Sequence, residues 1–140
     1  MYQINEGTFV APEGWRDESI NVFICPDNSG INLTITRAAI SMGIPPEETY
    51  QDTLKEFSAN LPGYKEIGRH ALMLGNAPAY QLEYQWKSPE GMMHQLVVML
   101  VMEDLLVSFT FTSPGLLSHS QKAALLPTIL NFRARNSREA

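Results

Sequence analysis

Charged residues are scarce in this chain of 140 residues. They make up 18% of the sequence, against roughly a quarter in an average globular protein. The net charge is −5, which disfavours binding to a phosphate backbone, so we expect no nucleic-acid partner. A surface with few charges instead favours an apolar contact with another protein.

The sequence has one cysteine, and its composition predicts neither a signal peptide nor a membrane-spanning run. Cys25 cannot form an internal disulfide, and its apolar neighbours indicate a small buried side chain rather than a reactive thiol. The N-terminus lacks a basic region followed by an apolar one. The longest apolar run stops at Glu103, well short of the roughly 20 residues that span a bilayer. We therefore expect a cytoplasmic protein with no stable membrane association.

Catalytic and metal-binding motifs are also missing. His70, His94 and His119 are not spaced with Cys25 as zinc ligands are. No nucleophile elbow, metalloprotease helix, phosphate loop or dinucleotide fingerprint occurs. The sequence predicts no metal, no cofactor and no enzymatic activity, although a catalytic site assembled from distant residues stays an alternative.

Hydrophobic periodicity and turn residues predict a single α+β domain over residues 1–140, with 132–140 as a flexible tail. We expect a mainly antiparallel, curved sheet of six to seven strands with two helices packed on one face. The strands are expected at 8–11, 19–25, 31–37, 64–74, 79–87 and in a hairpin over 94–113, and the helices at 43–63 and 118–132.

Both helices carry terminal signals. Pro46 suits a first turn, and Tyr50, Leu54, Phe57 and Leu61 form an apolar stripe. In the second helix, Ser118 and Gln121 form a candidate capping box, and Pro127 should kink or end the helix.

The hairpin at 94–113 contains a strand that is apolar on both sides. Phe109 and Phe111 alternate with hydroxyl residues and must face the core. If Met102 and Leu105 close the hairpin, Leu96 lies beside Phe111 on the core face, because cross-strand neighbours share a face. The opposite face then receives Met93, Gln95, Val97 and Met99, whereas a three-residue loop would reverse the assignment.

The strand at 19–25 raises the same question. Phe23 is its largest apolar residue, so we place Phe23 in the core and turn Ile20, Val22 and Ile24 outward. Two helices can cover one side of such a sheet but hardly both. The sequence thus predicts an uncovered apolar face that marks a binding site. A strand buried on both sides and a dimer interface remain alternatives.

The segment "APEGWRDESINVF" resembles the N-terminal signature of the Eag (EagR) chaperones of the bacterial type VI secretion system. The resemblance is carried in order by Pro12, Trp15, Asp17, Ser19, Asn21, Phe23, Arg37, "LPG" at 61–63, "YQW" at 84–86 and Gln95. It spans nearly the whole chain.

This resemblance implies a PsbP/Mog-like fold, a homodimer and a role without catalysis. Eag chaperones bind the N-terminal hydrophobic helices and PAAR region of a secreted, Rhs-type effector, and shield its transmembrane helices until it is loaded on the VgrG spike. The family's client groove maps onto Ile20, Val22, Thr34, Leu61 and Gln95. Together with Ile24, Met93, Val97 and Met99 from the strand pattern, these are the candidate client-binding residues. The alternative is a dimeric regulatory module of the same fold that binds a soluble, folded partner.

Overall fold

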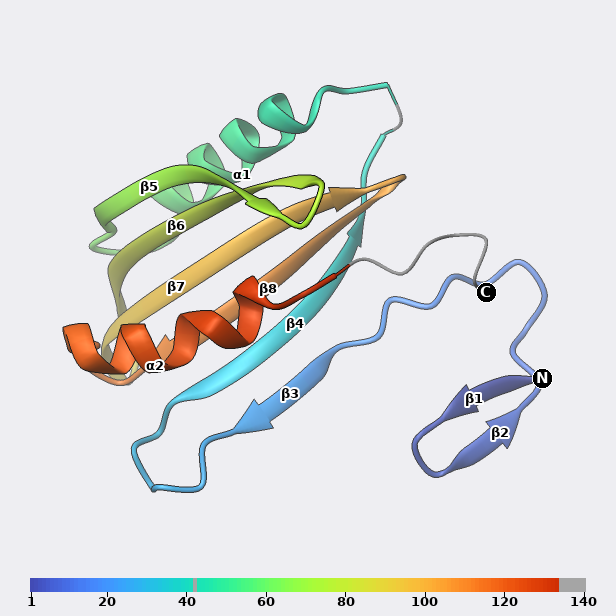
Figure 1. Ribbon diagram of the computed structural model, residues 1–140, viewed down its shortest axis with the longest axis horizontal. Helices are drawn as coiled ribbons and strands as arrows, with labels where there is room; N and C mark the ends of the chain where they lie inside the picture. The colour runs from blue at the N-terminus through green and yellow to red at the C-terminus, as the bar shows by residue number, and fades with distance from the viewer. Residues whose placement is uncertain (42, 134–140) are drawn as a thin grey trace.

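The computed structural model describes residues 1–41 and 43–133 and contains two antiparallel sheets (Figure 1). A small sheet pairs β1 with β2, and a six-stranded sheet has the order β3-β4-β8-β7-β6-β5. The strands are β1 Tyr2–Ile4, β2 Gly7–Phe9, β3 Asn21–Ile24, β4 Asn32–Ala39, β5 Lys65–Leu74, β6 Ala77–Ser88, β7 Gly91–Met102 and β8 Leu105–Ser113, and the helices are α1 Pro46–Asn60 and α2 His119–Leu130.

The α+β class and the antiparallel sheet are confirmed. The N-terminal strand expected at 8–11 is instead a short hairpin, β1–β2, in which Tyr2 pairs with Phe9. Of the tail expected at 132–140, residues 134–140 lie outside the described part of the chain.

The expected register of the β7–β8 hairpin is confirmed. Met102 pairs with Leu105 and Leu96 with Phe111, so the loop contains only Glu103 and Asp104. Phe109 and Phe111 are buried. With this two-residue loop, the faces of β7 are those expected from the alternation of β8.

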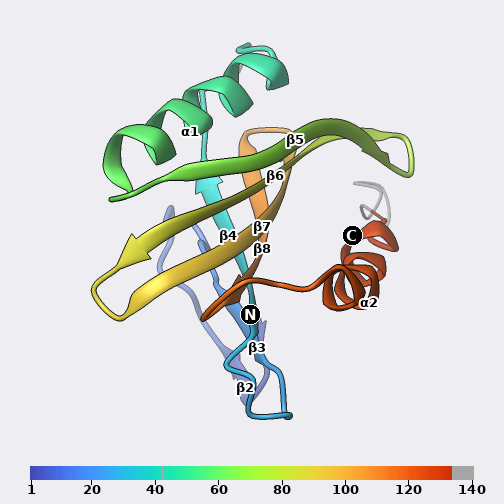
Figure 2. The same ribbon diagram turned by 90° about the vertical axis from the view of Figure 1, so that its left-hand side faces the viewer.

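The prediction that both helices pack on one face is wrong, because α1 and α2 lie on opposite sides of the sheet (Figure 2). On the α2 side, Ile129 packs in a core that includes Leu96, Val98 and Phe109. On the α1 side, Tyr50 and Leu54 join a second core with Tyr80, Leu82, Tyr84, Val97 and Met99. The physical reason is that β7 is apolar on both faces, and each face needs a cover.

Tyrosines attach α1 to the sheet. The Tyr50 hydroxyl donates a hydrogen bond to the Pro78 carbonyl at 3.3 Å and accepts one from the Val101 N–H at 3.2 Å. Its ring stacks on Tyr80 with centroids 5.5 Å apart. Burial raises the pKa of Tyr50 and of Tyr84, because the apolar core disfavours the charged phenolate.

The helix α2 begins with the expected capping box between Ser118 and Gln121. It continues one turn beyond Pro127 to Leu130 rather than ending there. Pro127 removes one backbone donor, but the Asn131 N–H still bonds the Pro127 carbonyl at 3.0 Å.

His94 joins α2 to the sheet from a buried position. Its Nδ1 accepts a hydrogen bond from the Leu117 N–H at 2.8 Å, so Nε2 carries the proton and donates to Glu83 Oε2 at 2.7 Å. Lys122 Nζ reaches the same carboxylate at 3.0 Å. The imidazole thus satisfies a buried backbone donor and a partly buried carboxylate together.

We expect His94→Leu to lower the free energy of unfolding by about 2–3 kcal/mol, since it leaves the Leu117 N–H unpaired and Glu83 with one partner fewer. Urea denaturation measures this. The matched control is His70→Leu on exposed β5, which should change stability by less than about 0.5 kcal/mol. Equal effects of the two substitutions would contradict a structural role for the His94 contacts.

Candidate functional site

The helix α1 covers only part of its side of the sheet. Its core takes buried residues from β6, β7 and the start of β8, and leaves the end formed by β3 and β4 without helical cover. Two cross-strand rows run across this end. One joins Val22, Thr34, Thr110 and Val97, and the other joins Ile24, Asn32, Thr112 and Gln95.

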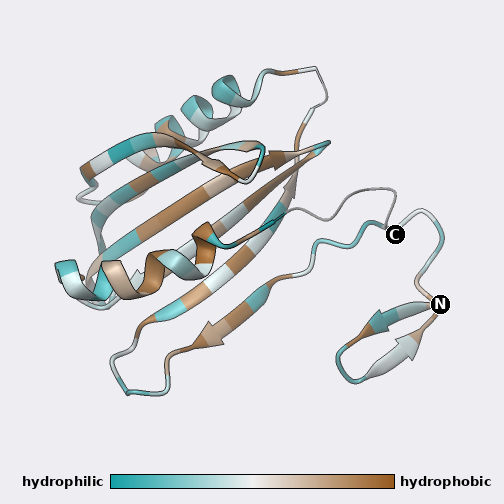
Figure 3. Ribbon diagram, in the orientation of Figure 1, coloured by the Kyte–Doolittle hydropathy of each residue, from teal (hydrophilic) through white to brown (hydrophobic). Residues whose placement is uncertain are grey.

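We call the accessible part of this surface the uncovered strip. It consists of Val22, Ile24, Asn32, Thr34, Thr110, Thr112 and Gln95 from these rows, and of Ile20, which directly precedes β3 and is exposed. Figure 3 shows the hydrophobic colouring of β3 beside the alternating colours of β4. None of the eight residues is charged.

The strip has an apolar edge and a polar floor. Ile20, Val22 and Ile24 are 62%, 58% and 77% exposed, whereas Thr34 and Thr110 are half-buried. Leaving such aliphatic side chains in water forgoes roughly 1.5–3 kcal/mol each, and contiguous exposed apolar residues mark an interaction surface.

Gln95 is held in one orientation at the boundary between the strip and the α1 core. Its Oε1 accepts hydrogen bonds from the Tyr84 hydroxyl at 2.7 Å and from Trp86 Nε1 at 2.9 Å. Its Nε2 donates to Thr112 Oγ1 at 3.0 Å. These bonds use one of the two Nε2 hydrogens, so the second can serve a ligand.

The structure brings five of the nine predicted client-binding residues into the strip. Ile20, Val22 and Ile24 are exposed as expected. Val22 pairs with Thr34, and Ile24 lies in the same cross-strand row as Gln95. Leu61 caps the C-terminal end of α1 and packs against the α1 core. Met93 is half-buried opposite Trp86 near the end of β7.

Val97 and Met99 were wrongly predicted to be accessible. They lie on the expected face, but they are only 2% and 0% exposed, because Tyr50 and Leu54 of α1 pack in the same core. They support the strip from within the core and do not form its surface.

Asn32 and Thr112 complete the strip and were missed from the sequence. Thr112 follows Thr110 by two residues, and Asn32 precedes Thr34 by two. Residues two apart on a strand share a face, so this spacing could have placed Asn32 and Thr112 in the strip.

The described residues contain no group of three or more His, Cys, Asp or Glu that could hold a metal ion. Within the same part of the chain, no helix is long and apolar enough to cross a membrane. The uncovered strip itself is uncharged and carries hydroxyl and amide groups.

Known proteins share this architecture. The family model described as DcrB matches residues 6–130. Effector EagT6 of Pseudomonas aeruginosa is 26% identical over 127 residues, covering 88% of this chain and 88% of that protein. This similarity agrees with the resemblance to the Eag chaperones.

Two solved structures show the fold. The crystal structure of PA94 from Pseudomonas aeruginosa matches with a TM-score of 0.80 and 21% identity, and covers 97% of this chain and 96% of its own. LpqN of Mycobacterium tuberculosis, described as involved in cell envelope biogenesis, matches with a TM-score of 0.52 and 15% identity over 81% of this chain and 80% of its own.

Two valines on the same cross-strand row test the extent of the strip. We expect Val97→Asp to lower the free energy of unfolding by about 3–5 kcal/mol or to abolish folding, since it buries a charge without a partner. Val22→Asp should change it by less than about 1 kcal/mol, because Val22 is mostly exposed. Denaturant titration followed by circular dichroism measures both. Comparable losses would mean that Val22 also belongs to the core.

Proposed function

This chain belongs to the DcrB family, and on that premise we propose that it is a cytoplasmic type VI secretion chaperone. In this role it binds the N-terminal transmembrane helices of a PAAR-containing, Rhs-type effector, shields them from water, and stabilises the effector. It aids loading of the effector on the VgrG spike, and it acts as a homodimer by binding rather than catalysis.

The observation that carries this proposal is the uncovered strip. A transmembrane helix is apolar all round and would aggregate in water or insert in the wrong membrane. The exposed Ile20, Val22 and Ile24 offer such a helix an apolar contact in place of lipid. The similarity to a protein named Effector EagT6 supports an effector as the partner.

The polar floor suits a membrane helix better than a soluble domain. Helices that pack in membranes use Ser, Thr and small residues at their contacts, and hydrogen-bond across them. Thr34, Thr110 and Thr112 present hydroxyls in adjacent strands, and Gln95 is already oriented by three bonds. A strip without charges also avoids the cost of desolvating an ion against an apolar client.

Charge substitutions on the apolar edge should abolish client binding. We expect Val22→Asp and Ile24→Asp to weaken binding of the effector's N-terminal segment at least a hundredfold, about 3 kcal/mol, because an aspartate would be buried against an apolar helix. Co-purification and titration with that segment measure the loss.

The matched control is Met92→Asp, which alters an exposed apolar residue of β7 on the α2 side and should leave binding unchanged. Circular dichroism of each variant separates a binding defect from unfolding. If the protein instead captures a soluble folded domain, and apolar helices do not compete, the regulatory module is the correct function.

Binding to the strip should depend little on ionic strength. No charged residue belongs to the strip, and salt screens only interactions between charges. We expect the dissociation constant for the client's apolar helices to change by less than about threefold between low and high salt. A steep weakening in salt would place the client on a charged surface instead.

A further inference from the structure

Residues 1–18 form an arm that stands apart from the rest of the fold (Figure 1). Every residue of this arm is exposed, including the large apolar side chains. Tyr2, Ile4, Phe9, Val10 and Trp15 are 37%, 47%, 45%, 78% and 78% exposed. Several of these side chains surround a hollow of about 570 Å³ that is lined by Tyr2, Phe9 and Trp15.

The aromatic side chains of this arm are not buried by the rest of the described chain. The Tyr2 and Phe9 rings lie 5.9 Å apart across the β1–β2 pair. A two-stranded hairpin by itself is at best marginally stable in water. The concentration of exposed aromatic residues on it therefore indicates a surface that is buried against a partner.

The surface area of the chain supports this conclusion. Its accessible surface is 9334 Å², whereas a folded monomer of 15.7 kDa is expected to expose about 7,300 Å². The eight residues outside the described part can account for at most about 1,300 Å² of the excess, from the area of an unfolded chain. The remaining excess of about 700 Å² is close to the roughly 800 Å² that each partner buries in an interface of standard size.

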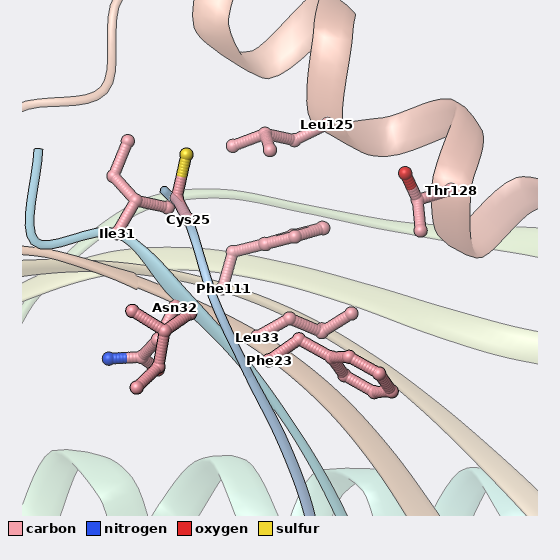
Figure 4. Close-up of a pocket in the computed structure, with 9 residues that line it drawn as sticks. Phe23, Cys25, Ile31, Asn32, Leu33, Phe111, Leu125 and Thr128 are labelled. Atoms are coloured by element: carbon pink, nitrogen blue, oxygen red, sulfur yellow. The ribbon is translucent and has the colours of Figure 1, made fainter. Parts of the chain in front are cut away.

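A second accessible apolar surface lies on the α2 side of β3. A pocket of about 340 Å³ is lined mainly by apolar residues of the sheet and α2. Figure 4 shows Cys25, Ile31 and Phe111 beneath Leu125 of α2. Phe23, at the same pocket, is 57% exposed, so the prediction that it lies in the core is wrong.

The strand β3 also leaves the sheet with an unprotected edge. It is the terminal strand of the sheet, is exposed over all four residues, and contains no charge and no proline. The opposite terminal strand, β5, carries Lys65, Glu66 and Arg69 together with a register shift. Charges and bulges are the usual protection of an edge strand, so only the β5 edge is built to stay unpaired.

We propose that the arm is exchanged between two copies of this chain, with β1–β2 of one copy packed on β3 and in the α2-side pocket of the other. The inference specifies the interface of the homodimer proposed above. A twofold exchange covers the arm and the pocket of both copies, because the same contact is made twice. A foreign partner would have to supply covers for two separate surfaces.

The exchange leaves Val22 accessible, since Val22 lies on the α1 side of β3 beside Thr34. Ile24 also borders the α2-side pocket, so the exchanged arm would contact it.

The single cysteine of the chain allows a direct test. Cys25 lines the pocket, so we expect Phe9→Cys, oxidised with copper phenanthroline, to form a disulfide between two chains. A covalent dimer on a non-reducing gel supports the exchange. A disulfide within one chain, or none, overturns it. The double variant F9C/C25S is the control, and should lose the covalent dimer if Cys25 is the partner.

Light scattering provides a second test that does not depend on oxidation. We expect the natural protein to have twice the 15.7 kDa chain mass, and the double variant Phe9→Ser with Trp15→Ser to have the mass of one chain. Leu116→Ser, which alters a residue 69% exposed outside both surfaces, should stay dimeric. A dimeric arm variant that still binds the client would overturn the exchange and leave the proposed function intact. Circular dichroism verifies that each variant is folded.

Discussion

The constraint on which this structure depends is the burial of β7 on both of its faces. Leu96, Val98 and Leu100 face one side, Val97 and Met99 the other, and all five are at most 2% exposed. A strand of this kind must lie between two apolar layers. The chain therefore places α1 on one face and α2 on the other, and neither face receives both helices.

A single helix is too narrow to cover a face of six strands. With its side chains a helix is about 10–12 Å wide, and strands are spaced about 4.8 Å apart, so one helix covers two or three strands. On the α1 side the helix packs over β6 and β7. The β3 end is therefore poorly covered on both faces, which explains why the uncovered strip and the apolar pocket lie near the same strand.

Local patterns predicted what is local in this fold. The alternation of Phe109 and Phe111 with hydroxyl residues identified the core face of β8, and the assumption that Met102 and Leu105 close the hairpin carried that assignment to β7. The side on which α1 packs is a long-range property that no short pattern encodes. The prediction of exposure was therefore correct for Ile20, Val22 and Ile24. It was wrong for Val97 and Met99, which α1 buries. The arm was predicted as one strand because three-residue strands carry almost no periodic signal.

The division of β3 between two surfaces links the two proposals physically. Val22 and Ile24 point to the α1 side, and Phe23 and Cys25 point to the α2 side, because neighbours along a strand alternate. Within the six-stranded sheet, β3 has one neighbour, β4, and an edge strand of four residues is weakly held. An exchanged arm packed on β3 would order this strand before a client arrives. Such ordering lowers the entropy lost on binding, so in the proposed dimer each copy pre-organises the client-binding surface of the other.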